Sequence, residues 1–168
     1  NDINGFYSHQ NSKTSKRRVS NYSKSKYFKD MVEMYIGSEE KKVIYESPDG
    51  RWHVAFAVNP FTGPVAISFV NGVFIPDNGT HVNHVFDQVI KRVKEDLEAN
   101  SKVKKNGLVI KPSYIKDNII IFVKCLIDNP SFESQTKQKL KTSPLDFGTK
   151  CSIPDDIITK VSKLGLAD

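Results

Sequence analysis

The sequence lacks the features that mark several large classes of protein. Its two cysteines, Cys125 and Cys151, are too few and too scattered for a structural zinc site or a disulfide framework. A reducing compartment is therefore the expected environment. No apolar run approaches the ~20 residues that a membrane helix needs, so we expect no membrane partner.

Acidic residues are missing from two stretches of the chain. Residues 3–29 hold seven Lys or Arg and no Asp or Glu, and residues 99–116 hold five Lys and again no acid. The formal net charge of the 168 residues is +6. This balance favours anionic partners without identifying them, because many basic domains bind nothing in particular.

Familiar catalytic motifs are absent as well. The sequence contains no GxxxxGK[ST] loop and no HExxH, GxSxG or GxGxxG run. His81 and His84 have a spacing that suits metal ligation on a helix, but no third ligand accompanies them. We interpret the pair as surface or cap residues and predict no metal site. The pattern indicates a domain that works with chemistry housed elsewhere.

Hydrophobic periodicity predicts an α/β domain. We expect a short amphipathic helix at residues 27–37, a β-hairpin around the Ser-Pro-Asp-Gly turn at 47–50, and a strand at 65–72 followed by a loop. A long helix should begin at Thr80 as its N-cap, with one apolar stripe. Residues 117–127 predict a buried central strand, and a last helix should carry Pro154 in its first turn.

Two runs resemble eukaryotic-type DNA topoisomerase II. They are AISFVNGVFIPDNGTHVNHVFDQVIKRV at residues 66–93 and IFVKCLIDNPSFESQTKQKLKTSPLDFGTKC at residues 121–151. The similarity extends, with gaps, from about Tyr27 through Cys151. The runs FVNG…GTHV and NPSFESQTK stand in the family's order and at a suitable separation.

The resemblance implies a transducer domain and its fold. That fold is ribosomal-protein-like α/β, with a mixed sheet, a left-handed βαβ crossover and helices packed on one face. Residues 27–168 would be the transducer, and the basic, Ser-rich residues 1–26 an insert or the end of an ATPase domain plus linker. The chain does not begin with Met, and we expect it to be a fragment of a longer chain.

The resemblance also implies functional residues. In the family, a loop of this kind reaches the neighbouring ATPase domain and touches the γ-phosphate of ATP, with the lysine acting in catalysis. The matching residues here are Gln135, Thr136 and Lys137. A basic loop that contacts DNA matches Lys102, Lys104 and Lys105. ATP and Mg²⁺ would bind mainly outside this chain segment.

The implied partners are double-stranded DNA, the ATPase domain and cleavage core of the same chain, and a second copy in a full-length homodimer. The location would be nuclear for a cellular eukaryotic protein, or the host cytoplasm for a divergent member from a large DNA virus. A different class also fits the charge, namely a stand-alone basic domain that binds nucleic acid without catalysis. A mismatch-repair or chaperone ATPase fits the two runs less well.

Overall fold

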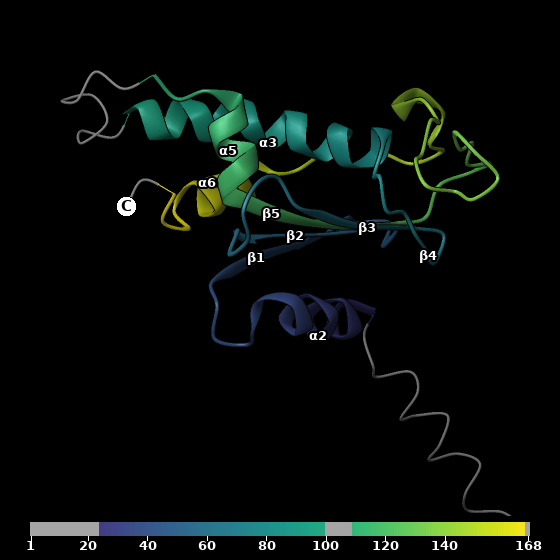
Figure 1. Cartoon of the computed structure of the whole chain (residues 1–168), viewed down its shortest axis with the longest axis horizontal. Coiled ribbons are helices and arrows are strands. Elements are labelled where there is room, and N and C mark those ends of the chain that lie inside the picture. The colour runs from purple at the N-terminus through teal and green to yellow at the C-terminus, as the bar shows by residue number, and fades with distance from the viewer. Residues whose placement is uncertain (1–23, 100–108, 167–168) are drawn as a thin grey trace, which may run out of the picture.

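A five-stranded mixed sheet organises the chain, with strand order β1-β2-β5-β3-β4 (Figure 1). This computed structural model describes residues 24–99 and 109–166. The strands are β1 (Lys42–Glu46), β2 (Trp52–Val58), β3 (Ala66–Val70), β4 (Val73–Phe74) and β5 (Ile119–Cys125). The mixed α/β architecture predicted from the sequence is confirmed.

The first two strands form the predicted hairpin. Their turn is closed by the Gly50 amide, which donates to the Ser47 carbonyl at 2.8 Å, and Gly50 has φ +65°. Glycine adopts a positive φ more readily than any other residue, so the Asp-Gly sequence is well matched to this turn. Strand β2 then pairs antiparallel with the central strand β5.

Strand β5 lies between β2 and β3 and is the central strand that its apolar sequence predicts. Six of its seven side chains are buried, from Ile119 to Val123 and at Cys125. It pairs parallel with β3, in a register that joins Ala66 to Ile121 and Val70 to Cys125. The strand is shorter than the predicted 117–127, because helix α5 occupies the preceding residues.

Three helices pack on one face of the sheet: α3 (Thr80–Ala99), α5 (Pro112–Asn118) and α6 (Asp155–Ser162) (Figure 1). The predicted stripe of α3 is buried, as shown by the list Val82, Val85, Phe86, Val89, Val93 and Leu97. Two details were wrong. The buried hydroxyl of Thr80 has no hydrogen-bond partner among the described residues, so it does not cap the helix. Pro154 precedes α6 instead of lying in its first turn, because the helix begins at Asp155.

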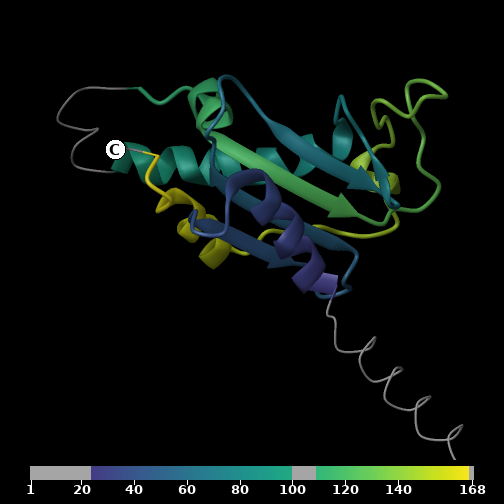
Figure 2. The ribbon, with the colours of Figure 1, turned by 60° about the horizontal axis from the view of Figure 1, so that its bottom comes forward.

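Helix α2 (Lys24–Ile36) lies on the opposite face and forms a second, smaller layer (Figure 2). Its buried residues Phe28, Val32 and Ile36 cluster with Ala55 and Phe122 of the sheet. The helix ends where predicted, at Gly37, whose amide donates to the Glu33 carbonyl at 2.8 Å. The prediction of helices packed on one face therefore holds for α3, α5 and α6, whereas α2 covers the other face.

The connection from β3 to its parallel neighbour β5 runs through α3 and α5. Figure 2 views the sheet from the α2 side, with both strands pointing the same way and α3 behind them. Passing from β3 behind the sheet and back into β5 makes a left-handed crossover. Nearly all such connections are right-handed, so the sequence pattern alone would have predicted the wrong hand.

Candidate functional site: the QTK hairpin

Residues 131–141, which we call the QTK hairpin, are more ordered than the loop that the sequence suggests. Phe132 and Leu140 form an antiparallel bridge, and the Glu133 amide donates to the Lys139 carbonyl at 2.9 Å. The Lys141 amide donates to the Ser131 carbonyl at 2.8 Å. Two short arms thus carry a tip at residues 134–138.

The tip presents Gln135, Thr136 and Lys137, and all three are exposed. The Lys137 amide donates to the Ser134 carbonyl at 3.0 Å and closes the turn. Lys137 has φ +54°, a left-handed conformation that costs a non-glycine residue about 1 kcal/mol or more. Its ammonium lies 5.8 Å from the centre of the Phe132 ring, a weak cation–π contact at an exposed site.

The return arm of the hairpin is attached to the segment that leads into α3. The Asp77 amide donates to the Gln138 carbonyl at 2.9 Å, the Leu140 amide to the Asn78 carbonyl at 2.9 Å, and the Thr80 amide to the Leu140 carbonyl at 3.2 Å. Between these rungs the Leu140 side chain is buried, with 1% of its surface exposed. We call this three-rung ladder the inner anchor.

An outer anchor holds the chain where it leaves β5 toward the hairpin. Arg51 donates to the Leu126 carbonyl at 2.9 Å and to the Gly148 carbonyl at 3.1 Å, and it pairs with the Asp128 carboxylate at 2.7 Å. The Asp128 amide in turn donates to the Phe147 carbonyl at 3.0 Å. One guanidinium therefore ties the start of β2 to both ends of the hairpin segment, using its fixed fork of donors.

Asn71 completes the outer anchor from the end of β3. Its side-chain amide donates to the Ile127 carbonyl at 3.0 Å, and its side-chain oxygen accepts from the Ile127 amide at 2.9 Å. The side chain thus pairs with a backbone residue as a neighbouring strand would. Asn71 has φ +50°, which asparagine tolerates better than most residues. Sequence reasoning missed Arg51, Asn71 and Asp128 as site residues.

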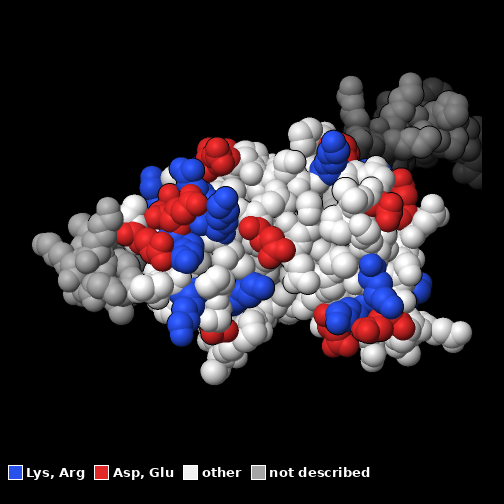
Figure 3. Space-filling model, turned by 90° about the horizontal axis from the view of Figure 1, so that it is seen from above, with Lys and Arg blue, Asp and Glu red and all other residues white. Residues whose placement is uncertain are grey.

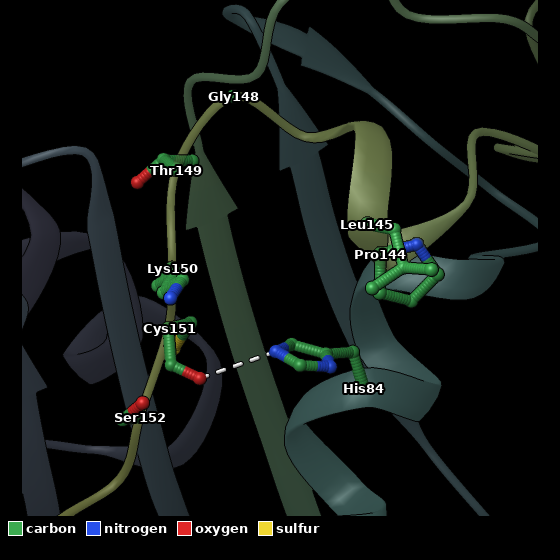
Figure 4. A pocket seen from close by; sticks show the side chains of 8 residues that line it. All are labelled: His84, Pro144, Leu145, Gly148, Thr149, Lys150, Cys151 and Ser152. Carbon is green, nitrogen blue, oxygen red and sulfur yellow. Dashed lines mark hydrogen bonds between the residues drawn. The ribbon is translucent and has the colours of Figure 1, made fainter.

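Residues 144–153, which follow the hairpin and which we call the strap, pack against α3 and leave a pocket of about 460 Å³ (Figure 4). Its lining residues are His84, Pro144, Leu145, Gly148, Thr149, Lys150, Cys151 and Ser152. The His84 ring lies 3.1 Å from the Cys151 carbonyl, and Gln88 donates to the same carbonyl at 3.0 Å. The side-chain oxygen of Gln88 accepts from the Ile153 amide at 3.0 Å, so hydrogen bonds attach the strap to α3.

The titratable groups near the two anchors have environments that fit a structural role. Hydrogen bonds from the hydroxyls of Ser47 and Thr149 lower the pKa of Asp49 to about 2, which keeps the carboxylate charged. Burial lowers the pKa of His81 to about 4. His81 is fully buried, so its interpretation as a surface or cap residue was wrong, whereas His84 is partly buried and lines the pocket.

Charged side chains on the α3 face gather at the two ends of the molecule, with an uncharged area between them (Figure 3). Along α3, cations are paired with acids: Arg92 with Asp96 at 3.2 Å and Lys94 with Glu98 at 3.7 Å. Lys102, Lys104 and Lys105 lie outside the described residues.

The described part of the chain contains no group of three His, Cys, Asp or Glu side chains suited to a metal ion. Within residues 24–99 and 109–166, none of the helices has the length and apolar character to span a membrane.

Comparison with known proteins places this geometry in a family. The chain is 40% identical over 161 residues to DNA topoisomerase 2 of Saccharomyces cerevisiae, covering 86% of this chain and 11% of that relative. It is similar to the solved ATPase region of Saccharomyces cerevisiae topoisomerase II, with a TM-score of 0.70 and 44% identity, covering 83% of this chain and 35% of that one.

A second solved structure contains the ATPase and transducer domains of DNA topoisomerase II from Balamuthia mandrillaris. It matches with a TM-score of 0.72 and 29% identity, covering 82% of this chain and 33% of that one. This chain therefore spans about a tenth of the length of its curated Saccharomyces relative. The model of the DNA gyrase B family matches residues 11–162. The chain belongs to the DNA gyrase B family.

Proposed function

We propose that this chain is the transducer part of an ATP-dependent type II DNA topoisomerase, and that the QTK hairpin contacts the γ-phosphate of ATP in an adjoining ATPase domain. The observation that carries the proposal is an exposed tip with an amide and a lysine, mounted on arms that two anchors hold. The match to solved ATPase and transducer domains of topoisomerase II supports it.

The tip residues suit the chemistry of phosphoryl transfer. Charge develops on the equatorial oxygens of the transferred phosphoryl group, and a positioned cation with an amide donor stabilises it. Lys137 supplies the cation and is the residue that we assign to catalysis, while Gln135 and Thr136 supply hydrogen-bonding groups beside it. Lysine is a compact charge on a flexible stem, which suits a contact made when two domains close. Release of phosphate would weaken this contact and free the domains to move.

The remaining ligands belong to other parts of the proposed parent protein. ATP supplies the phosphoryl group, and Mg²⁺ would be held mainly by residues outside this chain. We assign Lys102, Lys104 and Lys105 to contacts with double-stranded DNA, because phosphate contacts need charge and reach with little demand on sequence. The ATPase domain, the cleavage core and a second copy are the proposed partners, with a nuclear location in a cellular eukaryote.

The test uses the longer protein that contains this chain, and measures DNA-stimulated ATP turnover and supercoil relaxation. We expect Lys137→Ala to lower turnover by at least ~10²-fold, the usual loss when one charged contact to the transition state is removed. Lys104→Ala should retain basal turnover and lose part of its stimulation by DNA. Lys139→Ala is the matched control, because this lysine sits on the hairpin arm, 3.8 Å from Glu133, and its loss should leave turnover nearly unchanged.

An unchanged turnover in Lys137→Ala would contradict the proposed role of the tip. The alternative, a basic nucleic-acid-binding domain without catalysis, would then account for the charge of the chain. It predicts DNA binding that weakens steeply with salt, and it gives Gln135 and Lys137 no role beyond charge.

A further inference from the structure

The inner anchor contains one backbone contact that only glycine permits. Gly79 is buried and has φ +137°. A Cβ atom added at this residue would lie 2.3 Å from the Leu140 carbonyl oxygen and 2.7 Å from the Leu140 amide nitrogen. Both neighbours are main-chain atoms, which cannot rotate aside as a flexible side chain would. Any other residue at 79 would therefore push the return arm of the QTK hairpin away.

The contact joins the hairpin to the start of the longest helix in the described residues. Gly79 directly precedes α3, a helix of 20 residues with eight buried side chains. The rungs on either side of the contact fix the return arm at Gln138 and Leu140, adjacent to the tip. The direction of the tip is thus set relative to α3 through the backbone, and the close approach at Gly79 is what allows the rungs to form.

We propose that Gly79 is a positioning residue, which holds the QTK hairpin at the angle and depth that present Lys137 and Gln135 to the phosphate. This inference rests on the proposed function of the tip. Relieving the 2.3 Å contact to an ordinary distance would move the arm by about 1 Å. A displacement of that size at a reacting group can lower a rate by about 10²-fold.

The chain offers a matched control at Gly63. It also has a left-handed φ, +77°, but nothing lies within 4 Å of an added Cβ. Gly63→Ala therefore places an alanine at a positive φ without the collision. It lies in the β2–β3 connection, at the end of β2 remote from the anchors. Comparing the two alanine variants isolates the close contact from the general cost of losing a glycine.

The experiment measures steady-state ATP turnover in the longer protein and amide hydrogen exchange in the same variants. We expect Gly79→Ala to lower kcat by about 10²-fold with little change in KM for ATP, and Gly63→Ala to stay within about threefold of the parent. The double variant Gly79→Ala/Lys137→Ala should be no slower than Lys137→Ala alone. The Leu140 and Thr80 amides should lose protection while the sheet keeps its own.

The two variants together distinguish a failure of the positioning role from a failure of the proposed function. If Lys137→Ala slows turnover and Gly79→Ala does not, the positioning role is wrong and the proposed function stands. If neither slows turnover, both fail. Should Gly79→Ala not fold, Thr80→Pro replaces it. Proline is accepted at the first position of a helix, yet it removes the amide that bonds to Leu140. An unchanged kcat in a folded Thr80→Pro protein would then overturn the inference.

Discussion

Asn71 provides a sharp test of the outer anchor, through the change Asn71→Asp. The two side chains have nearly the same shape, and both tolerate the left-handed φ of +50° at this residue. The carboxylate keeps an oxygen that can accept from the Ile127 amide, but it loses the group that donates to the Ile127 carbonyl. Two oxygens then face each other across a distance of about 3.0 Å.

The expected loss follows from these two contacts. A hydrogen bond contributes about 0.5–1.5 kcal/mol net, and leaving a carbonyl unpaired adds a penalty that water partly relieves at this half-buried site. We expect the free energy of unfolding to fall by about 1–2 kcal/mol at pH 7. Urea unfolding of the 168-residue chain measures it. At about pH 3 the carboxyl group that replaces the amide is largely protonated and can donate again, so the deficit should shrink.

Asn78→Asp is the matched control. Asn78 also has a left-handed φ, +57°, but its side-chain oxygen accepts from the Ser68 hydroxyl at 3.0 Å, and its side-chain NH₂ group donates to none of the described residues. A carboxylate can accept the same bond, so the change should cost less than ~0.5 kcal/mol. Equal losses in the two variants, or no loss in Asn71→Asp, would refute the assignment of the anchor to the donated bond.

Three further predictions concern residues close to the two anchors of the QTK hairpin. Burial lowers the pKa of His81 from 6.5 to about 4, so this histidine takes up a proton in the unfolded chain at a higher pH than in the folded chain. The free energy of unfolding should therefore fall by up to about 3 kcal/mol as the pH drops from 6.5 to 4. An acid titration of the urea midpoint measures this, and an equal slope in His81→Leu would contradict it. Burial raises the pKa of both Cys125 and Cys151 to about 12, so a thiol reagent should modify them only on unfolding; fast reaction of the native chain would show an exposed thiolate. Gly148→Ala should destabilise the chain by more than about 1 kcal/mol, because the new methyl group would collide with Asp128 and φ is +68°; an unchanged thermal midpoint would argue against that crowding.

Local patterns were sufficient to predict much of the fold. The Ser-Pro-Asp-Gly turn fixed the position of the first hairpin, and the apolar stripe of α3 is buried as its spacing indicates. The two-residue strand β4 and the single-turn helix η1 (Pro144–Asp146) were missed, since each is too short to show a period. Helix α5 was missed because its buried side is represented by one residue, Ile115.

The outer anchor could not be predicted from local sequence. Arg51 and Asp128 are 77 residues apart, and Asn71 and Ile127 are 56 apart, so no window along the chain contains both partners. One signal was available. Asn71 and Asn78 each precede a glycine, a pair typical of left-handed turns, and both have positive φ. The pattern marked the turns correctly but carried no information about what they contact.

The anchors draw together residues from several separate stretches of the sequence. Arg51, Asn71, Gly79 and Gly148 belong to four stretches of the sequence, and each contacts a segment bordering or within the QTK hairpin. None of them carries the proposed phosphate chemistry. A flexible lysine reaches a phosphate productively only when its backbone is held in place, so the proposed contact depends on these supporting residues as well as on the tip. Helix α3 adds a second consequence. It begins at the inner anchor, which hydrogen bonds attach to the hairpin, and in the sequence this 20-residue helix leads toward Lys102, so it is one continuous element between the two proposed contact sites.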